Sequence, residues 1–248
     1  MSAGGPRLCV PELAGELAAG RDVALPAGVA HHAAKVLRLR VGDRVTLFSG
    51  AGGEFAATML RIDRRSVTAH VESFEDVERE VALTTILVQS VVASDAMDYA
   101  IRKSVELGAT AVQPVITARS APLPAGPRAV QRQARWRNIA IAACEQCGRN
   151  RLPDVRDTVA LDAWLAARDV ASAGIVLALD APRTLAQLPP PLALDILIGP
   201  EGGLTADEVA RAERAGLAAV RLGPRVLRAE TAGCAVLAAV HALWGDFR

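Results

Sequence analysis

From Thr84 onward, the sequence alternates continuous apolar runs with segments of helical periodicity. A run without polar alternation is typical of a strand buried on both faces, and such strands belong to parallel sheets. The predicted strands are Thr85–Val92, Ala111–Ile116, Gly174–Leu179, Leu194–Ile198 and Leu217–Leu222. The predicted helices are Met97–Leu107, Ala129–Cys147, Leu161–Ala167, Ala206–Ala215 and Thr231–Trp244. Alternation of strands and helices predicts an open α/β fold for this part of the chain.

The segment from Val41 to Phe74 has a different, two-residue period. Apolar side chains alternate with polar or small ones on both sides of a glycine-rich turn at Gly50–Gly53, and a second turn is expected at Asp63–Ser66. This pattern predicts an antiparallel meander, a small β-barrel, with a helix before it at about Pro26–Leu39. The charged stretch that follows is typical of a linker. The predicted division is therefore a barrel domain at 1–74, a linker at 75–82 and an α/β domain at 83–248.

Composition limits the function less sharply than these patterns do. The 248 residues carry a net charge of +1, so the whole chain gives no sign of a nucleic-acid partner. Aromatic residues make up only 3%, which leaves few stacking platforms for single-stranded RNA. No apolar run is long enough to span a bilayer, and residues 1–11 lack the pattern of a signal peptide. Four cysteines in such a chain form no disulfide framework, so we expect a reducing, cytoplasmic setting.

Basic residues gather between Arg128 and Arg156. Seven arginines stand there against Glu145 and Asp154, which leaves a local excess of five positive charges. A solvated helix face is the ordinary explanation of such a run. Because the excess is one-sided and consists of arginine, it favours contact with phosphate.

The most informative segment is Ile196–Glu208, in which a buried strand ends in a glycine-rich loop and a helix follows. Thr205 and Glu208 have the spacing of a capping box, which marks the start of that helix. In open α/β sheets, ligands bind beyond the carboxyl ends of the strands, and glycines let the backbone approach them closely. The loop has neither the Lys-Ser/Thr of a phosphate loop nor the dinucleotide fingerprint. Glu201 would repel phosphate but tolerates a neutral nucleoside or a cationic sulfonium. A tight turn without a ligand is the alternative.

A second loop of this kind follows the last predicted strand, at Leu222–Ala232. It carries Arg225, Arg228 and Glu230 just before a helix. An exposed pair of Arg228 with Glu230 would stabilise the fold little. Two loops at two strand ends favour a shared site.

Two further segments carry polar side chains that could reach a partner. Cys144 and Cys147 form a C-x-x-C motif, but no second pair lies at zinc spacing, and the motif ends a helix capped by Gly148. That helix end is expected to present Glu145 and Arg149. His31 and His32 lie on different faces of a helix and so do not predict a metal site. With Lys35, Arg38 and Arg40 they form a basic helix edge, for which RNA contact is the sharper interpretation.

Taken together, these segments resemble the RsmE family of 16S rRNA (uracil-N3)-methyltransferases, of the SPOUT superfamily. The matching stretches are Ile198–Leu204 (IGPEGGL), Leu222–Thr231 (LGPRVLRAET), Ala142–Arg151 (AACEQCGRNR), Ser104–Gly108 (SVELG) and His31–Leu39 (HHAAKVLRL). The resemblance extends over nearly the whole chain. One departure is Val92–Asp98, which lacks the basic residue that family members usually carry there.

The resemblance implies an N-terminal PUA-like barrel that binds RNA and a SPOUT α/β-knot domain that binds S-adenosylmethionine. It also implies a homodimer and a substrate in the small ribosomal subunit, while the motifs suggest no metal and the apolar runs no membrane partner. The expected cofactor contacts are Leu179, Ile198, Gly199, Pro200, Glu201, Gly202, Leu222, Gly223, Leu227, Arg228, Thr231 and Ala232. The expected RNA contacts are His32, Lys35, Arg38, Arg40, Arg132, Arg135 and Arg149.

Methylation at N3 of uracil requires loss of the N3 proton, and the resulting anion spreads its charge over O2 and O4. A fixed guanidinium aimed at those oxygens favours the transition state. Arg228 is the first catalytic candidate and Arg225 the second, while Glu201 or Glu230 could accept the proton. Two other functions remain open from the sequence: an RNA-binding protein without catalysis, and a nucleotide-dependent enzyme that uses the glycine loop for phosphate.

Overall fold

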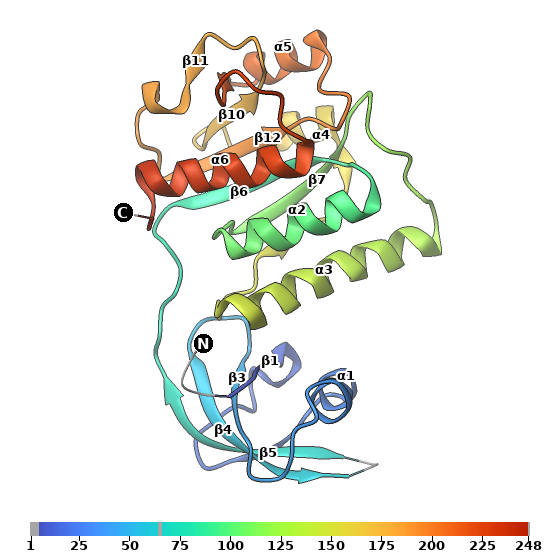
Figure 1. The fold of residues 1–248 in the computed structure, drawn as a ribbon, viewed down its shortest axis with the longest axis vertical. Coiled ribbons are helices and arrows are strands. Elements are labelled where there is room, and N and C mark those ends of the chain that lie inside the picture. Colours follow the sequence, from blue (N-terminus) through green and yellow to red (C-terminus); the bar gives the residue numbers. More distant parts are fainter. Residues whose placement is uncertain (1–4, 64–65, 248) are drawn as a thin grey trace. The chain divides into compact units, whose positions relative to one another are not determined.

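The computed structural model describes residues 5–63 and 66–247, and these form two compact units (Figure 1). The first unit takes in the chain up to Glu80 together with the segment Cys144–Leu152. The second consists of Val81–Ala143 and the chain from Pro153 onward. The break after Glu80 falls inside the predicted linker. Residues 144–152, however, belong to the first unit and not to the α/β domain in which the predicted division put them.

The first unit contains a five-stranded sheet in the order β1-β3-β4-β5-β2. Its strands are β1 (Arg7–Cys9), β2 (Asp22–Ala24), β3 (Arg44–Phe48), β4 (Glu54–Ile62) and β5 (Val67–Glu75). The predicted meander corresponds to the antiparallel strands β3, β4 and β5, whereas β1 joins β3 in parallel. The turn between β3 and β4 needs glycine, because Gly50, Gly52 and Gly53 all have positive φ. Of the second predicted turn, residues 64 and 65 lie outside the described residues.

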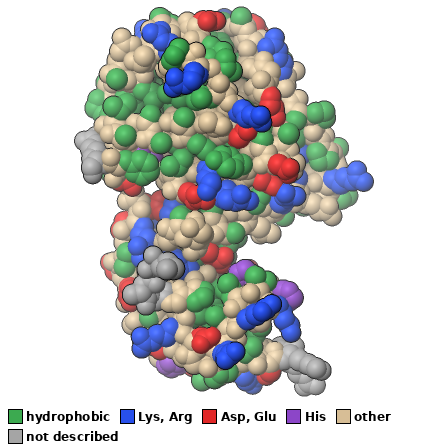
Figure 2. All heavy atoms as spheres, viewed as in Figure 1, with side chains coloured by type: hydrophobic (Ala, Val, Ile, Leu, Met, Phe, Trp, Pro, Cys, Tyr) green, Lys and Arg blue, Asp and Glu red, His purple; other side chains and the backbone are tan. Residues whose placement is uncertain are grey.

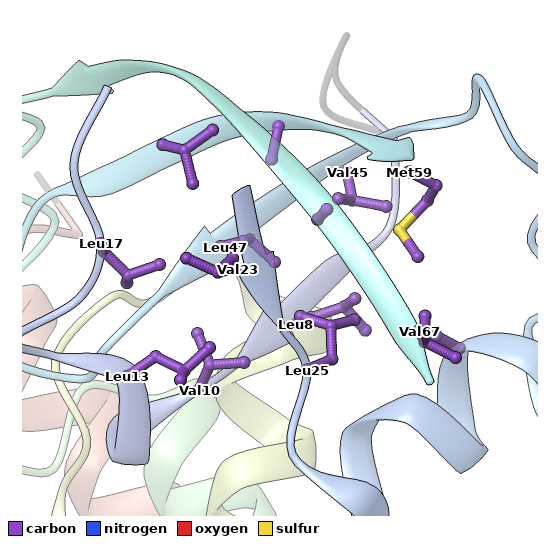
Figure 3. Packing of buried hydrophobic residues seen from close by; sticks show 14 residues of the cluster. Leu8, Val10, Leu13, Leu17, Val23, Leu25, Val45, Leu47, Met59 and Val67 are labelled. Carbon is purple, nitrogen blue, oxygen red and sulfur yellow. The ribbon is translucent and has the colours of Figure 1, made fainter. Parts of the chain in front are cut away.

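The predicted helix before the meander is α1 (Ala27–His31), which continues as a π-helical turn over His32–Val36. A short 3-10 turn, η1 (Pro11–Leu13), precedes it. The core of the unit is formed by every second residue of the strands, such as Val45 and Leu47 on β3 and Met59 on β4, all at most 3% exposed. Figure 3 shows these side chains with those of Leu8, Val23 and Leu25 between the sheet and its flanking segments.

The second unit is built on an eight-stranded sheet in which every pairing is parallel, in the order β11-β13-β10-β12-β6-β7-β8, with β9 beside β7. The strands are β6 (Thr84–Ser90), β7 (Ala111–Ile116), β8 (Asp154–Val155), β9 (Val159–Ala160), β10 (Ala173–Leu177), β11 (Arg183–Thr184), β12 (Ala193–Ile198) and β13 (Leu217–Arg221). The helices are α2 (Ser94–Glu106), α3 (Pro127–Cys147), α4 (Leu161–Ala167), the 3-10 turn η3 (Leu185–Gln187), α5 (Ala206–Arg214) and α6 (Ala229–Trp244). None of the described helices is long and apolar enough to cross a membrane.

Both faces of this sheet are covered, as the continuous apolar runs predict. Neighbouring residues of a strand point to opposite faces. On β12, Ile196 packs in a cluster with Leu237 of α6, and Leu197 packs in a separate cluster with Ala212 of α5. Because β13, β10 and β12 are neighbours and run in parallel, their carboxyl ends meet at one edge of the sheet.

The segment 144–152 is held in the first unit by buried polar contacts. Arg149 is 7% exposed, and its guanidinium pairs with Glu80 at 2.5 Å. Glu145 accepts the Cys9 N–H at 2.9 Å, and Asn150 donates to the Val77 carbonyl at 2.6 Å. The guanidinium of Arg149 is therefore engaged inside the protein, and an RNA contact of this residue stays a prediction for which the ion pair gives no support.

Two further arginines, Arg7 and Arg79, stabilise the same unit by pairing with one carboxylate. Glu54 is 6% exposed and receives Arg7 at 2.6 Å and Arg79 at 3.0 Å. Burial raises the pKa of the Glu54 carboxyl, but the hydrogen bonds from both arginines outweigh burial and hold this pKa below its ordinary value.

A variant that lacks the Arg149 guanidinium should unfold more easily than the parent, and no RNA contact should change. Arg149→Ala leaves the Glu80 carboxylate largely buried without its partner, which should lower the free energy of unfolding by about 3–5 kcal/mol. Arg151→Ala is the matched control, since it removes an exposed pair with Glu78 and should change that free energy far less. Urea unfolding followed by circular dichroism measures both. Equal losses in the two variants would contradict the structural role of Arg149.

Candidate active site

A pocket of about 260 Å³ lies at the edge of the sheet where β13, β10 and β12 end. Three loops line it: Leu177–Leu179 after β10, Gly199–Leu204 after β12, and the segment that follows β13. The first turn of α6 closes it with Ala229 and Ala232. The position is the one at which open α/β sheets bind ligands.

The lining suits a nucleoside better than a phosphate. Its walls are aliphatic, from side chains such as Leu177, Ile198 and Leu227, and the charged residues that line it are Glu201 and Arg225. Backbone groups of the glycine loop supply the remaining polarity. At Gly199 an added Cβ would come within 2.9 Å of the Leu204 amide nitrogen, so the loop is as tight as its glycine content predicts.

The glycine loop is fixed from three directions. The Glu201 carboxylate accepts the Ala93 N–H, at the start of α2, at 2.9 Å. The Arg119 guanidinium donates to the Gly202 carbonyl at 2.7 Å, and within the loop the Gly203 N–H donates to the Pro200 carbonyl at 2.8 Å. The Arg119 side chain and the Ala93 amide, from two other segments, therefore hold this loop in place before any ligand arrives.

Glu208, at the start of α5, fixes the segment that directly follows the glycine loop. Its carboxylate closes the predicted capping box with Thr205 and also accepts the Ala118 N–H at 2.7 Å. The side chain is 2% exposed. Burial raises the pKa of this carboxyl, but the hydrogen bonds from the Thr205 and Ala118 amides outweigh burial and bring the pKa below its ordinary value.

A second pocket, of about 770 Å³, adjoins the first between the starts of α2 and α6. Glu201, Val226, Leu227 and Ala229 line both pockets. The charged residues of the second are Asp95, Glu201, Arg228 and Glu230, and Tyr99 is its aromatic wall. An apolar pocket thus opens beside one rich in charged groups.

Comparison with known proteins identifies the family. Residues 79–241 match the family model of an RNA methyltransferase domain, and residues 25–72 match that of an RNA methyltransferase PUA domain. Ribosomal RNA small subunit methyltransferase E of Neisseria gonorrhoeae, solved with S-adenosyl methionine, is 37% identical, with a TM-score of 0.91 over 98% of this chain and 99% of that one. This chain belongs to the ribosomal RNA small subunit methyltransferase E family.

Two more relatives of this chain support its assignment to the methyltransferase E family. A Legionella pneumophila protein, solved with bound SAM, is 33% identical, with a TM-score of 0.92 over 97% of this chain and 98% of that one. Methyltransferase E of Mycobacterium bovis is 34% identical over 86% of this chain and 83% of its own length. The resemblance drawn from the IGPEGGL and LRAET stretches is confirmed, and so is the predicted fold class, a SPOUT-type methyltransferase domain with a PUA-like domain.

Nearly all of the cofactor contacts predicted for this methyltransferase E chain line the first pocket. The exceptions are Arg228 and Thr231, which line the second. Among the catalytic candidates, Arg225 lines the first pocket, Arg228 the second, and Glu201 both. The sequence-based prediction missed the remaining lining residues of the first pocket: Leu177, Ala178, Gly203, Leu204, Val220, Val226 and Ala229. Leu177 and Ala178 precede the predicted Leu179 directly, so the strand end itself was a usable signal. Tyr99 carried none, because its position depends on how α2 packs.

The predicted RNA contacts of this methyltransferase E chain fall into two groups. Lys35, Arg38 and Arg40 are exposed in the first unit, His32 is partly buried there, and no described acidic side chain forms an ion pair with the first three. On α3, however, Arg135 pairs with Asp98.

Further acidic partners reduce the local charge excess. Arg137 pairs with Asp157, and Arg156 with Asp154. On the visible face of the second unit, Figure 2 shows basic side chains beside acidic ones and no uniform basic stripe. Much of the arginine run therefore serves internal pairing.

The described residues contain no group of three His, Cys, Asp or Glu side chains placed to hold a metal ion. Cys144 is buried and Cys147 exposed, and both are free thiols.

Replacing Glu208 should show how strongly the glycine loop depends on its anchor. Glu208→Gln removes the charge that accepts the Thr205 and Ala118 amides, and should cost about 1–3 kcal/mol of unfolding free energy at pH 7. Since the folded pKa lies below the ordinary 4.5, this contribution is complete above that pH and is lost as the pH falls through the folded pKa. The gap between parent and variant in urea unfolding should therefore narrow in acid. Glu213→Gln, on the exposed side of α5, is the control. A gap that does not depend on pH would contradict this account.

Proposed function

We propose that this chain methylates N3 of a uridine in 16S rRNA and that S-adenosylmethionine is its cofactor. The observation that carries the proposal is the pair of adjoining pockets, one aliphatic with glycine-loop backbone and one with charged side chains. The relative from Neisseria gonorrhoeae, named as a small-subunit rRNA methyltransferase and solved with S-adenosyl methionine, supports both substrate and cofactor.

The first pocket would hold the cofactor. Leu177–Leu179, the glycine loop and the segment after β13 would enclose the nucleoside, with backbone amides and carbonyls recognising the base edge. When bound, S-adenosylmethionine supplies a methyl group on a sulfonium, whose C–S bond breaks as the N3–C bond forms. Glu201 lines this pocket, and its negative charge favours a cationic sulfonium over a phosphate.

The second pocket would hold the uridine. Arg228 is exposed there at the start of α6 and can place guanidinium donors on a uracil oxygen. Its positive charge stabilises the anion left when the N3 proton departs, and that anion is the nucleophile. Glu230 and Glu201 are the carboxylates that line this pocket. Because Glu201 already accepts the Ala93 N–H, Glu230 is the better acceptor for the N3 proton.

Three expectations follow from the family. Lys35, Arg38 and Arg40, with His32, would bring phosphates of the RNA to the PUA-like unit. The enzyme would act as a homodimer, and it would act in the cytoplasm, where the small ribosomal subunit is assembled.

Deletion of the gene should remove one N3-methyluridine from 16S rRNA, and restoring the gene should return it. The reason is that the charged second pocket offers the groups that N3 methylation needs. Mass spectrometry of nucleosides and of fragments from small-subunit rRNA measures the mark. A mark that persists in the deletion strain refutes the N3 assignment, even though the family assignment stands.

Arg228 and Arg225 should have separable defects, because they line different pockets. Arg228→Ala should bind S-adenosylmethionine nearly normally and lose roughly a hundredfold to a thousandfold in kcat, since it removes a donor that acts in the transition state. Higher pH should partly rescue it, because more uracil ionises unaided. Arg225→Ala should chiefly weaken cofactor binding.

Calorimetry with S-adenosylmethionine and kcat measured against pH distinguish the two variants. A kcat in Arg228→Ala equal to that of the parent, or a defect confined to cofactor affinity, would remove Arg228 from the catalytic role. Arg228→Lys should recover little, because a single ammonium does not reproduce the planar fork of the guanidinium.

A further inference from the structure

A third pocket, of about 480 Å³, lies along the first half of α3 and is not used by the chemistry above. Its charged lining residues are Arg128, Arg132 and Arg135. Spacings of four and three residues put these side chains on one face of a helix. The pocket therefore gathers a stripe of three guanidinium groups, and no acidic side chain lines it.

Arg132 is the unusual member of this stripe. Its guanidinium lies over the Trp136 ring, with Cζ 4.9 Å from the ring centroid, and Trp136 is only 2% exposed. Its Nε and Nη1 atoms are buried and find no hydrogen-bond partner among the described residues. Burial also lowers the pKa of this guanidinium, although an arginine keeps its charge in proteins. The fold thus holds a charge in position and leaves its donors unsatisfied.

The two neighbours of Arg132 are placed differently. Arg135 is tied to Asp98, a buried residue of α2, which fixes its direction. Arg128 is exposed at the first turn of α3 and has no ion-pair partner among the described residues. The positive end of the helix dipole adds to the charge of Arg128. An anion that enters this pocket would meet two guanidinium groups without carboxylate partners and one that is held from behind.

The third pocket neighbours the proposed substrate site, with which it shares one lining residue. Ala93 lines both the second and the third pocket, and Ser94, at the first turn of α2, lines the third. Pro122, Leu123 and Pro124 give the third pocket an apolar wall. A chain whose target base lies beside Arg228 can therefore lay its adjacent backbone along α3.

We infer that Arg128 and Arg132 bind a phosphodiester group next to the target uridine, with Arg135 as a third contact. The inference rests on the proposed function for the position of the target base. A phosphate in the pocket balances the charge that Arg132 carries without a carboxylate partner among the described residues, and planar guanidinium groups match phosphate oxygens in pairs. Arg137, at the next turn, faces Asp157 instead and takes no part.

Arg128→Gln and Arg132→Gln, compared with Arg137→Gln, test the site. Each of the first two should weaken binding of a 16S rRNA fragment that the parent methylates by about tenfold or more, and should lower the log–log salt slope by about 0.7. Arg137→Gln removes the same formal charge from the same helix and should change affinity and slope much less. S-adenosylmethionine affinity should stay at the parental value in all three.

Neutral methylphosphonate linkages, placed one at a time in the RNA, identify the phosphate. One linkage next to the target uridine should weaken binding to the parent clearly more than it weakens binding to Arg132→Gln, in which one of the phosphate's partners is already missing. If no position shows this pattern, or if Arg137→Gln is as impaired as Arg128→Gln, the cluster is only a diffuse positive field and the inference is wrong. Because Arg128 is exposed, its variant tests the site even if Arg132→Gln does not fold.

The outcome is distinguishable from failure of the proposed function. A parent that methylates no 16S rRNA fragment refutes that function, and the phosphate site is then tested by the salt slope on mixed-sequence single-stranded RNA. A parent that methylates the fragment, with Arg128→Gln and Arg132→Gln indistinguishable from Arg137→Gln, refutes the phosphate site alone.

Discussion

The site depends on a backbone loop, Gly199–Leu204, that is held by hydrogen bonds from elsewhere in the chain. Its three glycines, Gly199, Gly202 and Gly203, have the largest conformational entropy to lose on ordering. Arg119, Glu208 and the contact of Glu201 with the Ala93 amide restrict that freedom in the folded protein. These residues come from the starts of α2 and α5 and from the segment after β7. The first pocket therefore depends on three strand ends together, and no single motif would form it.

The same arrangement explains how much of the site could be predicted from the sequence. Apolar runs and the Thr205–Glu208 spacing locate the strands and the start of α5 closely, because both signals are local. The loops after β12 and β13 stand out by their glycines and arginines. The contacts between these loops and other segments are not local. The hydrogen bond from the Ala93 amide to Glu201 joins residues 108 positions apart. Tyr99 and Ala93 therefore line the second pocket although the sequence pattern gives no sign of it.

The division of the chain shows the same limit. Residues 142–147 continue the helical pattern of α3, and Gly148 marks the end of the helix. The sequence therefore predicts one helix within one domain. In the structure its last turn and the following loop join the first unit, through Glu145, Arg149 and Asn150. The partners of these three residues lie 69 to 136 residues away in the sequence. A local count of charges therefore cannot reveal that Glu145, Arg149 and Asn150 are bonded inside the protein.

Arginines in this chain are best distinguished by what satisfies their donors. Arg149 and Arg168 are buried and paired, with Glu80 and Asp195, so their charge is balanced and replacing either would leave a buried carboxylate alone. Arg137 and Arg156 have exposed partners, and such pairs stabilise a fold little. Arg132 is in a third situation, since its donors are partly buried and lack an acceptor among the described residues. The contact of its guanidinium with the Trp136 ring offsets part of the cost of desolvating this charge, and a bound anion would offset more. The partners of each arginine, and not the number of positive charges, therefore separate the arginines that stabilise the fold from those whose charge is not balanced by any carboxylate that the structure describes.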